Sequence, residues 1–166
     1  MKKFIPALLF GLFCTGAAHA QSAMAAASQV MKLPDEVASI AIWPLELASA
    51  QLDESLINAA SDEIEQALTR KAREKKLKVF TRRQLQSVVR EVKLSSLDKT
   101  SFDGLAKKTG ADVIMLPSAT LSKSGCLTIV IKALSTAADA QGEVLTASKP
   151  FKFGTRSGDL DVSGCD

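Results

Sequence analysis

The sequence is poor in the residues that many enzymes use for acid–base and metal chemistry. It contains one histidine, His19, and three cysteines among 166 residues. His19 lies in an amino-terminal segment that we expect to be removed, which would leave a mature chain without histidine. A Ser-His-Asp or Cys-His arrangement would then be impossible, and the commonest nitrogen ligand of zinc would be absent. We therefore expect no metal and no cofactor.

Phosphate-binding loops are also missing, and carboxylates are the remaining candidates for catalysis. Neither G-x-x-x-x-G-K-[ST] nor G-x-G-x-x-G occurs in the sequence. Three carboxylate pairs are present: Asp53/Glu54, Asp62/Glu63 and Asp159/Asp161. Glycosidases work with two carboxylates, but the first two pairs fall early in a predicted helix, where acids complement the helix dipole. We predict no catalytic residues, and a carboxylate-based hydrolase is the least favoured alternative.

Residues 1–20 have the pattern of a secretory signal peptide. Two lysines precede an apolar core over Ile5 to Cys14, and Ala18-His19-Ala20 is a small-x-small cleavage site. The core is shorter than the roughly 20 residues that a membrane span needs. We therefore expect export to the periplasm, cleavage after Ala20 and no transmembrane span after processing. Lipidation of Cys14 is the alternative, although the residues before it fit a lipoprotein signal poorly.

Removal of residues 1–20 leaves a nearly neutral chain with two cysteines. Two of the 21 basic residues leave with the segment, so nineteen basic and 18 acidic residues remain and the formal charge falls from +3 to +1. This balance favours no particular partner. Cys126 and Cys165 form an even pair in an exported chain, which predicts one disulfide. The alternative is two separate thiols, with Cys126 buried in a strand.

The hydrophobic pattern predicts a single α/β domain over residues 37–153. Strand patterns cover 37–45 and 77–80, and apolar residues recur at helical spacing across 51–76. Residues 21–36 are rich in Ala and Ser and read as a flexible lead-in or frayed helix, and 154–166 read as a carboxyl-terminal tail. The single Trp43 stands beside Pro44 at a strand end, where a core position is favoured over a ligand platform.

Signals for two further helices precede the last strands. Thr81 with Gln84 makes a capping box that begins a helix, and a short helix from about residue 101 ends before Gly110. Apolar runs on both sides of residues 123–125 then predict a hairpin, and a third run covers 143–153. The order predicts a mixed sheet with parallel pairing at the front, an antiparallel three-strand meander at the end, and helices packed on it.

One stretch departs from the charge balance. Residues 70–83 hold eight Lys or Arg against the single acid Glu74. A possible docking surface, here called the basic ridge, consists of Arg70, Lys71, Arg73, Lys75, Lys76, Arg82 and Arg83. The simpler interpretation is a solvated helix end. Only Phe80 interleaves with these charges, so we expect no nucleic acid; an acidic partner protein, anionic lipid or acidic polysaccharide suits them better.

Four short motifs stand in an order that resembles a known group of envelope proteins. They are I-A-I-W-P-L at 40–45, K-V-F-T-R-R-Q-L-Q-S-V-V-R-E at 78–91, K-T-G-A-D-V-I-M-L-P-S at 108–118 and G-E-V-L at 142–145. This pattern is similar to that of the group formed by CsgG, FlgO and the TolB amino-terminal domain. Trp43 and Leu45 depart from its usual residues around the proline, and the membrane-crossing hairpins of a curli-type pore have no counterpart.

The resemblance implies a small periplasmic α/β module that docks on an envelope assembly. Such an assembly would be a flagellar outer ring, an export apparatus, or a peptidoglycan synthase in the manner of the LpoB activators. These families are not enzymes, so we expect a non-enzymatic accessory protein in the periplasm or peripheral to the outer membrane, with oligomer formation open. The alternative function is a periplasmic binder of a small ligand or acidic polysaccharide.

Overall fold

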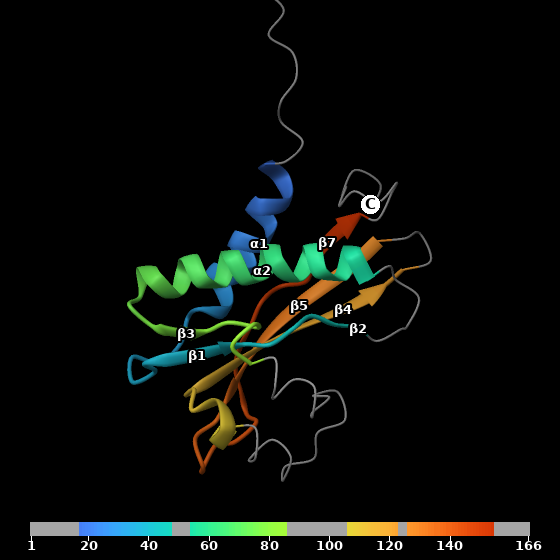
Figure 1. Cartoon of the computed structure of the whole chain (residues 1–166). Coiled ribbons are helices and arrows are strands. Elements are labelled where there is room, and N and C mark those ends of the chain that lie inside the picture. Colours follow the sequence, from blue (N-terminus) through green and yellow to red (C-terminus); the bar gives the residue numbers. More distant parts are fainter. Residues whose placement is uncertain (1–16, 48–53, 86–105, 123–125, 155–166) are drawn as a thin grey trace, which may run out of the picture.

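The computed structural model describes residues 17–47, 54–85, 106–122 and 126–154 (Figure 1). Its helices and strands follow in the order α1 (Ala17–Val30), β1 (Ser39–Ile42), β2 (Glu46–Leu47), α2 (Glu54–Glu74), β3 (Lys78–Phe80), β4 (Val113–Leu121), β5 (Cys126–Ser135), β6 (Val144–Ala147) and β7 (Phe151–Gly154). The strands form one mixed sheet on which the helices pack. The predicted single-domain α/β class is confirmed.

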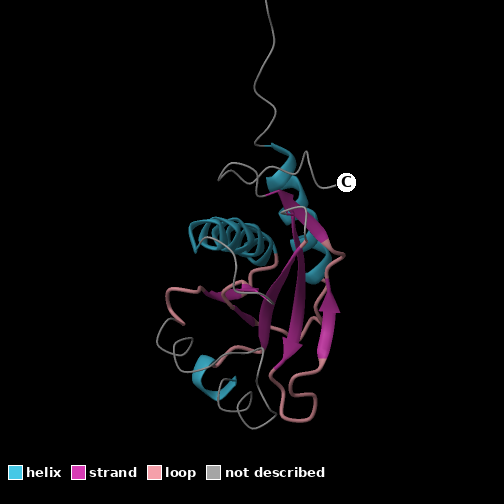
Figure 2. Cartoon of the chain, turned by 90° about the vertical axis from the view of Figure 1, so that its right-hand side faces the viewer, coloured by secondary structure: helices cyan, strands magenta, loops and turns pink. Residues whose placement is uncertain are grey.

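The sheet is parallel at one side and antiparallel at the other, as expected. Its order is β3-β1-β4-β5-β6, with β2 beside β4 and β7 beside β5. Strand β1 pairs in parallel with β3 and β4, whereas β5 pairs antiparallel with β4, β6 and β7. Figure 2 shows the resulting twisted sheet with α2 lying beside it.

The third strand of the predicted meander is divided in two. Residues 143–153 form β6 and β7, and the break contains Ser148 and Pro150. Proline has no N–H to donate to a strand ladder. Ser148 maintains the connection to β5, because its N–H donates to the Ile131 carbonyl at 2.8 Å and its Oγ accepts the Ile131 N–H at 2.9 Å. Both halves therefore remain fastened to one neighbour, β5.

One face of the sheet is covered by α1 and α2. The buried side of α2 carries Leu56, Ala60, Ile64 and Leu68, which recur at the predicted three-four spacing. Ala60, Ile64 and Leu68 pack in one core with apolar side chains of β1, β4 and β5, among them Ile42, Met115, Ile129 and Ile131. The amphipathic helix predicted over 51–76 is confirmed within its described part.

Helix α1 corrects the expectation of a flexible lead-in over residues 21–36. Ala23, Ala26, Ala27 and Val30 are at most 3% exposed and belong to the same core as α2 and the sheet. The carboxyl end of α1 is also fastened to the last strands, because Thr146 Oγ1 donates to the Val30 carbonyl at 2.6 Å. A small-residue stripe lets α1 approach its neighbours closely, so the segment is an integral part of the domain.

A smaller apolar cluster covers the opposite face near the parallel strands. It contains Ala41, Trp43, Leu85, Ala111 and Ile114. Trp43 is 2% exposed, and its indole N–H donates to Glu46 Oε1 at 3.2 Å. The core interpretation of Trp43 is therefore confirmed. Strand β1 ends just before Pro44, as a residue without an N–H requires.

Local signals at the helix ends agree with the sequence where they are described. Gly110 has φ +61° and donates its N–H to the Ala106 carbonyl at 3.0 Å, as a glycine after a helix end should. Gln84 Oε1 accepts the Thr81 N–H at 2.9 Å, which is one half of the predicted capping box. Most of the helix that this box predicts would lie beyond residue 85, outside the described residues.

Candidate functional site: a charged groove on helix α2

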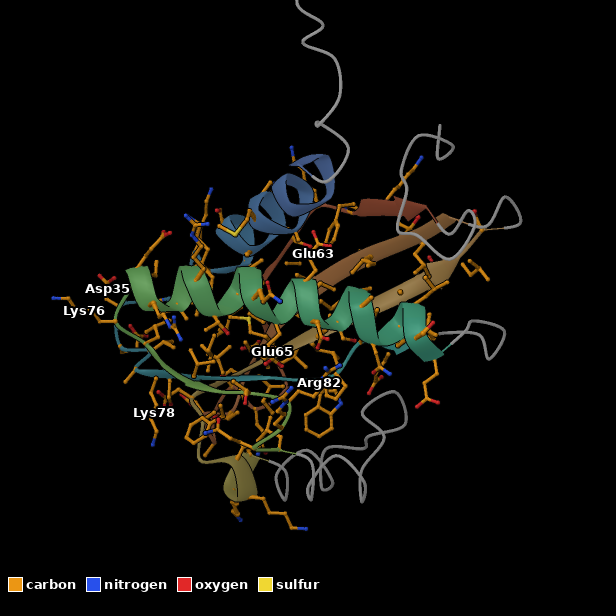
Figure 3. All side chains as sticks on the ribbon, turned by 45° about the horizontal axis from the view of Figure 1, so that its top comes forward. Asp35, Glu63, Glu65, Lys76, Lys78 and Arg82 are labelled. Atoms are coloured by element: carbon orange, nitrogen blue, oxygen red, sulfur yellow. The ribbon has the colours of Figure 1, made fainter. Side chains whose placement is uncertain are left out.

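The basic ridge lies on the last turns of α2 and on the segment that follows β3. Arg70, Arg73, Lys75, Lys76 and Arg83 are exposed, whereas Lys71 and Arg82 are partly buried. Figure 3 shows Lys76 at the carboxyl end of α2, away from Arg82, which lies under the middle of the helix. The ridge residues therefore lie in two places, at the carboxyl end of α2 and under the middle of the helix.

Two acids of α2 neutralise part of the ridge. Lys71 Nζ lies 2.7 Å from Glu74 Oε2, and the Arg82 guanidinium forms an ion pair with Asp62. The main-chain N–H of Arg82 also donates to Glu65 Oε2 at 3.2 Å. These contacts hold the segment after β3 against α2. Lys71 and Arg82 thus have structural partners and contribute less free positive charge than the sequence suggests.

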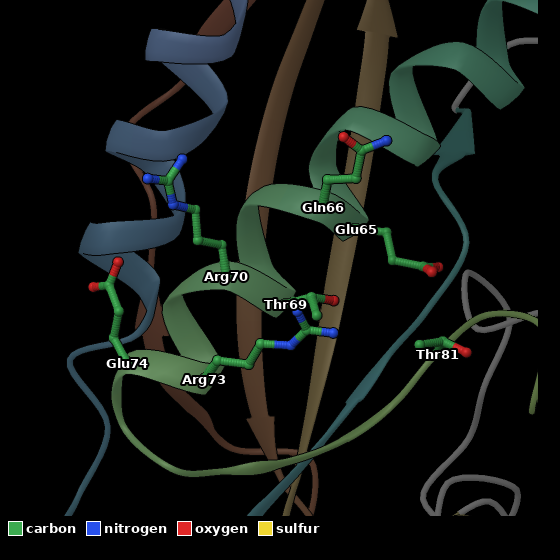
Figure 4. Close-up of a pocket in the computed structure, with 7 residues that line it drawn as sticks. All are labelled: Glu65, Gln66, Thr69, Arg70, Arg73, Glu74 and Thr81. Atoms are coloured by element: carbon green, nitrogen blue, oxygen red, sulfur yellow. The ribbon is translucent and has the colours of Figure 1, made fainter.

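The remaining cations of α2 border a surface groove of about 920 Å³. Its lining combines both signs of charge with neutral hydrogen-bonding groups: Glu65, Gln66, Thr69, Arg70, Arg73, Glu74 and Thr81. Figure 4 shows Arg73 reaching along α2 towards Thr69, whereas Arg70 points towards α1. Groups of this kind bind a polar or charged partner rather than an apolar one.

A second, smaller hollow of about 170 Å³ opens where α1 meets α2. It is lined by Met24 of α1 and by Glu63, Gln66, Ala67 and Arg70 of α2. Gln66 and Arg70 therefore border both hollows. Because α1 supplies Met24, the predicted lead-in contributes directly to the surface around Arg70.

Other candidates from the sequence are not brought together into a reactive site. Within the described ranges, no group of three His, Cys, Asp or Glu side chains is placed to hold a metal ion. Asp62 is exposed on α2 and is paired with Arg82, as expected of a solvated helix acid. Trp43 lines neither of the two hollows. Because Trp43 is only 2% exposed, its indole ring has no open face on which a ligand could stack.

Several predictions concern residues outside the described part of the chain. They involve the signal peptide's apolar core, the acids Asp53, Asp159 and Asp161, and Cys165. The backbone of Cys126 belongs to β5, but its side chain is also outside the description. The Cys126–Cys165 disulfide therefore stays a prediction. In the ranges that are described, no helix combines the length and apolar character needed to cross a membrane.

Sequence reasoning found the cations of the groove but missed its other members. Gln66, Thr69, Arg70 and Arg73 recur at intervals of three and four residues, so they occupy one side of α2. The helical spacing of these four polar residues is visible in the sequence and would have predicted that they share one side of α2. Thr81 joins the groove only because β3 returns beside α2, which requires the tertiary structure.

The architecture is that of a small α/β domain, and solved structures with this fold are known. No protein-family model and no curated protein matches the sequence. The LpoB C-terminal domain from Salmonella enterica aligns with a TM-score of 0.57 at 12% identity, over 83% of this chain and 99% of that one. The LpoB C-terminal domain from Escherichia coli gives 0.55 at 16% identity, over 80% and 96% respectively.

A third solved structure is a lipoprotein. GNA1162 from Neisseria meningitidis aligns with a TM-score of 0.49 at 13% identity, over 77% of this chain and 87% of that one. At such identities the LpoB alignments establish a shared fold, which covers nearly the whole LpoB domain. The fold is therefore LpoB-like. The resemblance to CsgG, FlgO and TolB is not confirmed by these structures and stays a prediction.

Proposed function

We propose that the protein is a non-enzymatic accessory protein of the cell envelope, which docks on peptidoglycan-synthesis machinery by protein contact. The observation that carries this proposal is the alignment of almost the entire LpoB C-terminal domain with this chain. The motifs at 40–45, 78–91 and 108–118 support it, because their resemblance implies envelope modules that include the LpoB activators.

The docking surface in this proposal is the basic ridge, centred on the exposed cations of α2. Arg70 and Arg73 are exposed on α2, and the exposed Lys75 follows directly after the last residue of the helix. Their removal leaves the core unchanged, because the buried side of α2 consists of other residues. The proposed location is the periplasm or the periplasmic side of the outer membrane, which follows from the predicted signal peptide.

Cross-linking in intact cells, followed by affinity capture, tests the proposal. The native protein is compared with a ridge variant, Arg70→Glu/Arg73→Glu/Lys75→Glu, and with a control variant, Lys32→Glu/Lys132→Glu/Lys149→Glu. Both variants change the charge equally, and all six positions are exposed. We expect the native and control proteins to capture a peptidoglycan synthase or its complex, and the ridge variant to lose it.

Two results would count against the proposal. Capture of no envelope protein by the native chain would remove the docking function. Turnover of a sugar or peptide substrate by the purified protein would assign it to a different class, the carboxylate-based hydrolases.

A further inference from the structure

We infer that the groove on α2 binds an extended protein segment of mixed charge, which places acidic side chains against Arg70 and Arg73. This inference rests on the proposed function and narrows the docking surface from the whole ridge to one groove. The occupant is a partner protein rather than a lipid surface or a polysaccharide.

Arg70 and Arg73 are the cations of the groove that remain available. Both are exposed, and neither forms an ion pair with another described residue, whereas Lys71 is paired with Glu74 and Arg82 with Asp62. The two arginines are three residues apart on α2, so their side chains leave the same side of the helix. Guanidinium groups bind carboxylates through paired hydrogen bonds, which makes acidic side chains the natural ligands.

The acids in the lining argue against a uniformly anionic partner. Glu65 borders the same groove as the arginines and forms no ion pair with another described residue, whereas the nearby Glu74 and Asp62 are paired with Lys71 and Arg82. A membrane of anionic lipids or a polysaccharide with regularly repeated carboxylates would bring negative charge against Glu65 and would compete with Glu74 and Asp62 for their cations. A polypeptide can vary its charge from one residue to the next, so it can match both signs.

The neutral members of the groove suit a peptide main chain. Gln66, Thr69 and Thr81 carry groups that both donate and accept hydrogen bonds, as N–H and C=O groups of an extended segment require. The volume of about 920 Å³ lies at the upper end of the range of about 300–1,000 Å³ that is usual for ligand pockets. The volume is large enough for a short stretch of peptide.

A random peptide library provides a probe that does not require the partner to be known. The processed protein is used to select peptides, and the enriched peptides are synthesised and titrated against native protein and two variants. The groove variant is Arg70→Glu/Arg73→Glu, and the control variant is Lys132→Glu/Lys149→Glu. Both change the charge by the same amount, and Lys132 and Lys149 are exposed cations outside the basic ridge and the groove lining.

We expect the selected peptides to combine Asp or Glu with residues of the opposite sign. Their affinity should fall about tenfold or more with the groove variant and remain within about twofold with the control variant. Replacement of the acidic residues in the peptide by Asn or Gln should cause a similar loss. Thermal melting of both variants checks that the domain stays folded.

Three outcomes would overturn the inference. An equal loss with both variants would mean that peptide binding depends only on the overall charge of the protein. Binding to phosphatidylglycerol vesicles or polygalacturonate as tight as binding to the selected peptides would assign the groove to an anionic surface. Failure to select acidic peptides would remove the peptide site altogether.

The cell-based capture separates this inference from the proposed function. If the groove variant still captures the same envelope protein as the native chain, the groove assignment fails and the accessory function stands. If the native chain captures nothing, the proposed function itself fails.

Discussion

At the scale of single residues, Asp112 joins two strands that are far apart in the sequence. Its Oδ2 accepts the N–H groups of Ala38 at 3.0 Å and Ser39 at 2.8 Å, and also the Ser39 hydroxyl at 2.8 Å. The main-chain N–H of Asp112 in turn donates a hydrogen bond to Ser39 Oγ at 3.1 Å. The aspartate in the G-A-D motif therefore aligns the start of β1 with the start of β4.

Replacement of Asp112 should destabilise the domain. Asp112→Ala leaves the N–H groups of Ala38 and Ser39 without their carboxylate, and we expect the free energy of unfolding to fall by about 2–3 kcal/mol. Asp112→Asn keeps one acceptor oxygen and should cost about half as much. Urea denaturation measures both. The control Asp139→Ala alters an exposed turn and should stay within about 0.5 kcal/mol; a comparable loss there would refute a specific role for Asp112.

Lys76 occupies a position that usually belongs to glycine. Its φ is 59°, the Leu77 N–H donates to the Ala72 carbonyl at 3.0 Å, and the Lys76 N–H donates to the Arg73 carbonyl at 3.0 Å. These two hydrogen bonds and the left-handed conformation define a Schellman motif at the end of α2. Glycine usually occupies the left-handed position of this motif, but here it is a lysine. The sequence predicted such an end at Gly110, but nothing in the sequence marks Lys76, because its conformation follows from the return of β3 beside β1.

Glycine at position 76 should therefore stabilise the protein. Lys76→Gly removes the steric cost of the left-handed conformation, and we expect the free energy of unfolding to rise by about 0.5–1 kcal/mol. The neighbouring substitution Lys75→Gly removes the same charge without this benefit and should be neutral or destabilising. Parallel thermal melts compare the two variants. A lower melting temperature for Lys76→Gly than for Lys75→Gly would contradict the prediction.

At the scale of elements, patterns of large apolar residues predicted the helices and strands correctly, whereas the alanine stripe of α1 did not predict a buried helix. Helix α2 and strands β1, β3, β4 and β5 were predicted because branched and aliphatic side chains recur along them. In α1 the buried side consists mainly of Ala23, Ala26 and Ala27. Alanine buries little area and is common in exposed segments, so hydrophobic periodicity carries almost no signal there.

A matched pair of substitutions in α1 tests whether this helix belongs to the core. Ala27 is 0% exposed, whereas Ala25 lies on the exposed side of the same helix. Ala27→Asp would bury an unpaired charge and should lower the free energy of unfolding by about 3 kcal/mol or more. Ala25→Asp should change it by about 0.5 kcal/mol or less. Equal stabilities in urea denaturation would show that α1 does not contribute to the folded domain.

At the scale of the whole molecule, local charge density indicated the region of the candidate site but not its composition. The ridge was recognisable from eight basic residues in 70–83. Its partial neutralisation was not, because Asp62 lies twenty positions before Arg82 in the sequence. The groove also depends on how β3 places Thr81 beside α2. Such pairings depend on tertiary contacts that no local pattern encodes.

The position of α1 bears on how a processed chain would begin. Helix α1 starts at Ala17 and therefore crosses the predicted cleavage site after Ala20. Cleavage there would retain Ala23, Ala26, Ala27 and Val30, the residues that pack in the core. The mature chain would then enter its first core helix almost at once, without the flexible lead-in that the sequence predicts.

The predicted Cys126–Cys165 disulfide would fasten the carboxyl-terminal segment to β5. Gly154 pairs with Cys126 across the β5–β7 ladder, and Cys165 follows Gly154 by eleven positions. An extended chain covers about 3.3–3.6 Å per residue, so this segment is long enough to return to Cys126. A cross-link between the two cysteines would stabilise the domain by up to about 4 kcal/mol in the chain-entropy model.

Thiol alkylation of unfolded protein from the periplasm, with and without reductant, tests the disulfide directly. We expect no modification before reduction and two modified cysteines afterwards. Cys126→Ser and Cys165→Ser should lower the melting temperature of the oxidised protein equally, because each removes the same covalent link. Under reducing conditions the native protein and Cys165→Ser should melt together, which separates loss of the bond from loss of a side chain. Two alkylated thiols before reduction would contradict the disulfide and leave residues 155–166 without a covalent connection to β5.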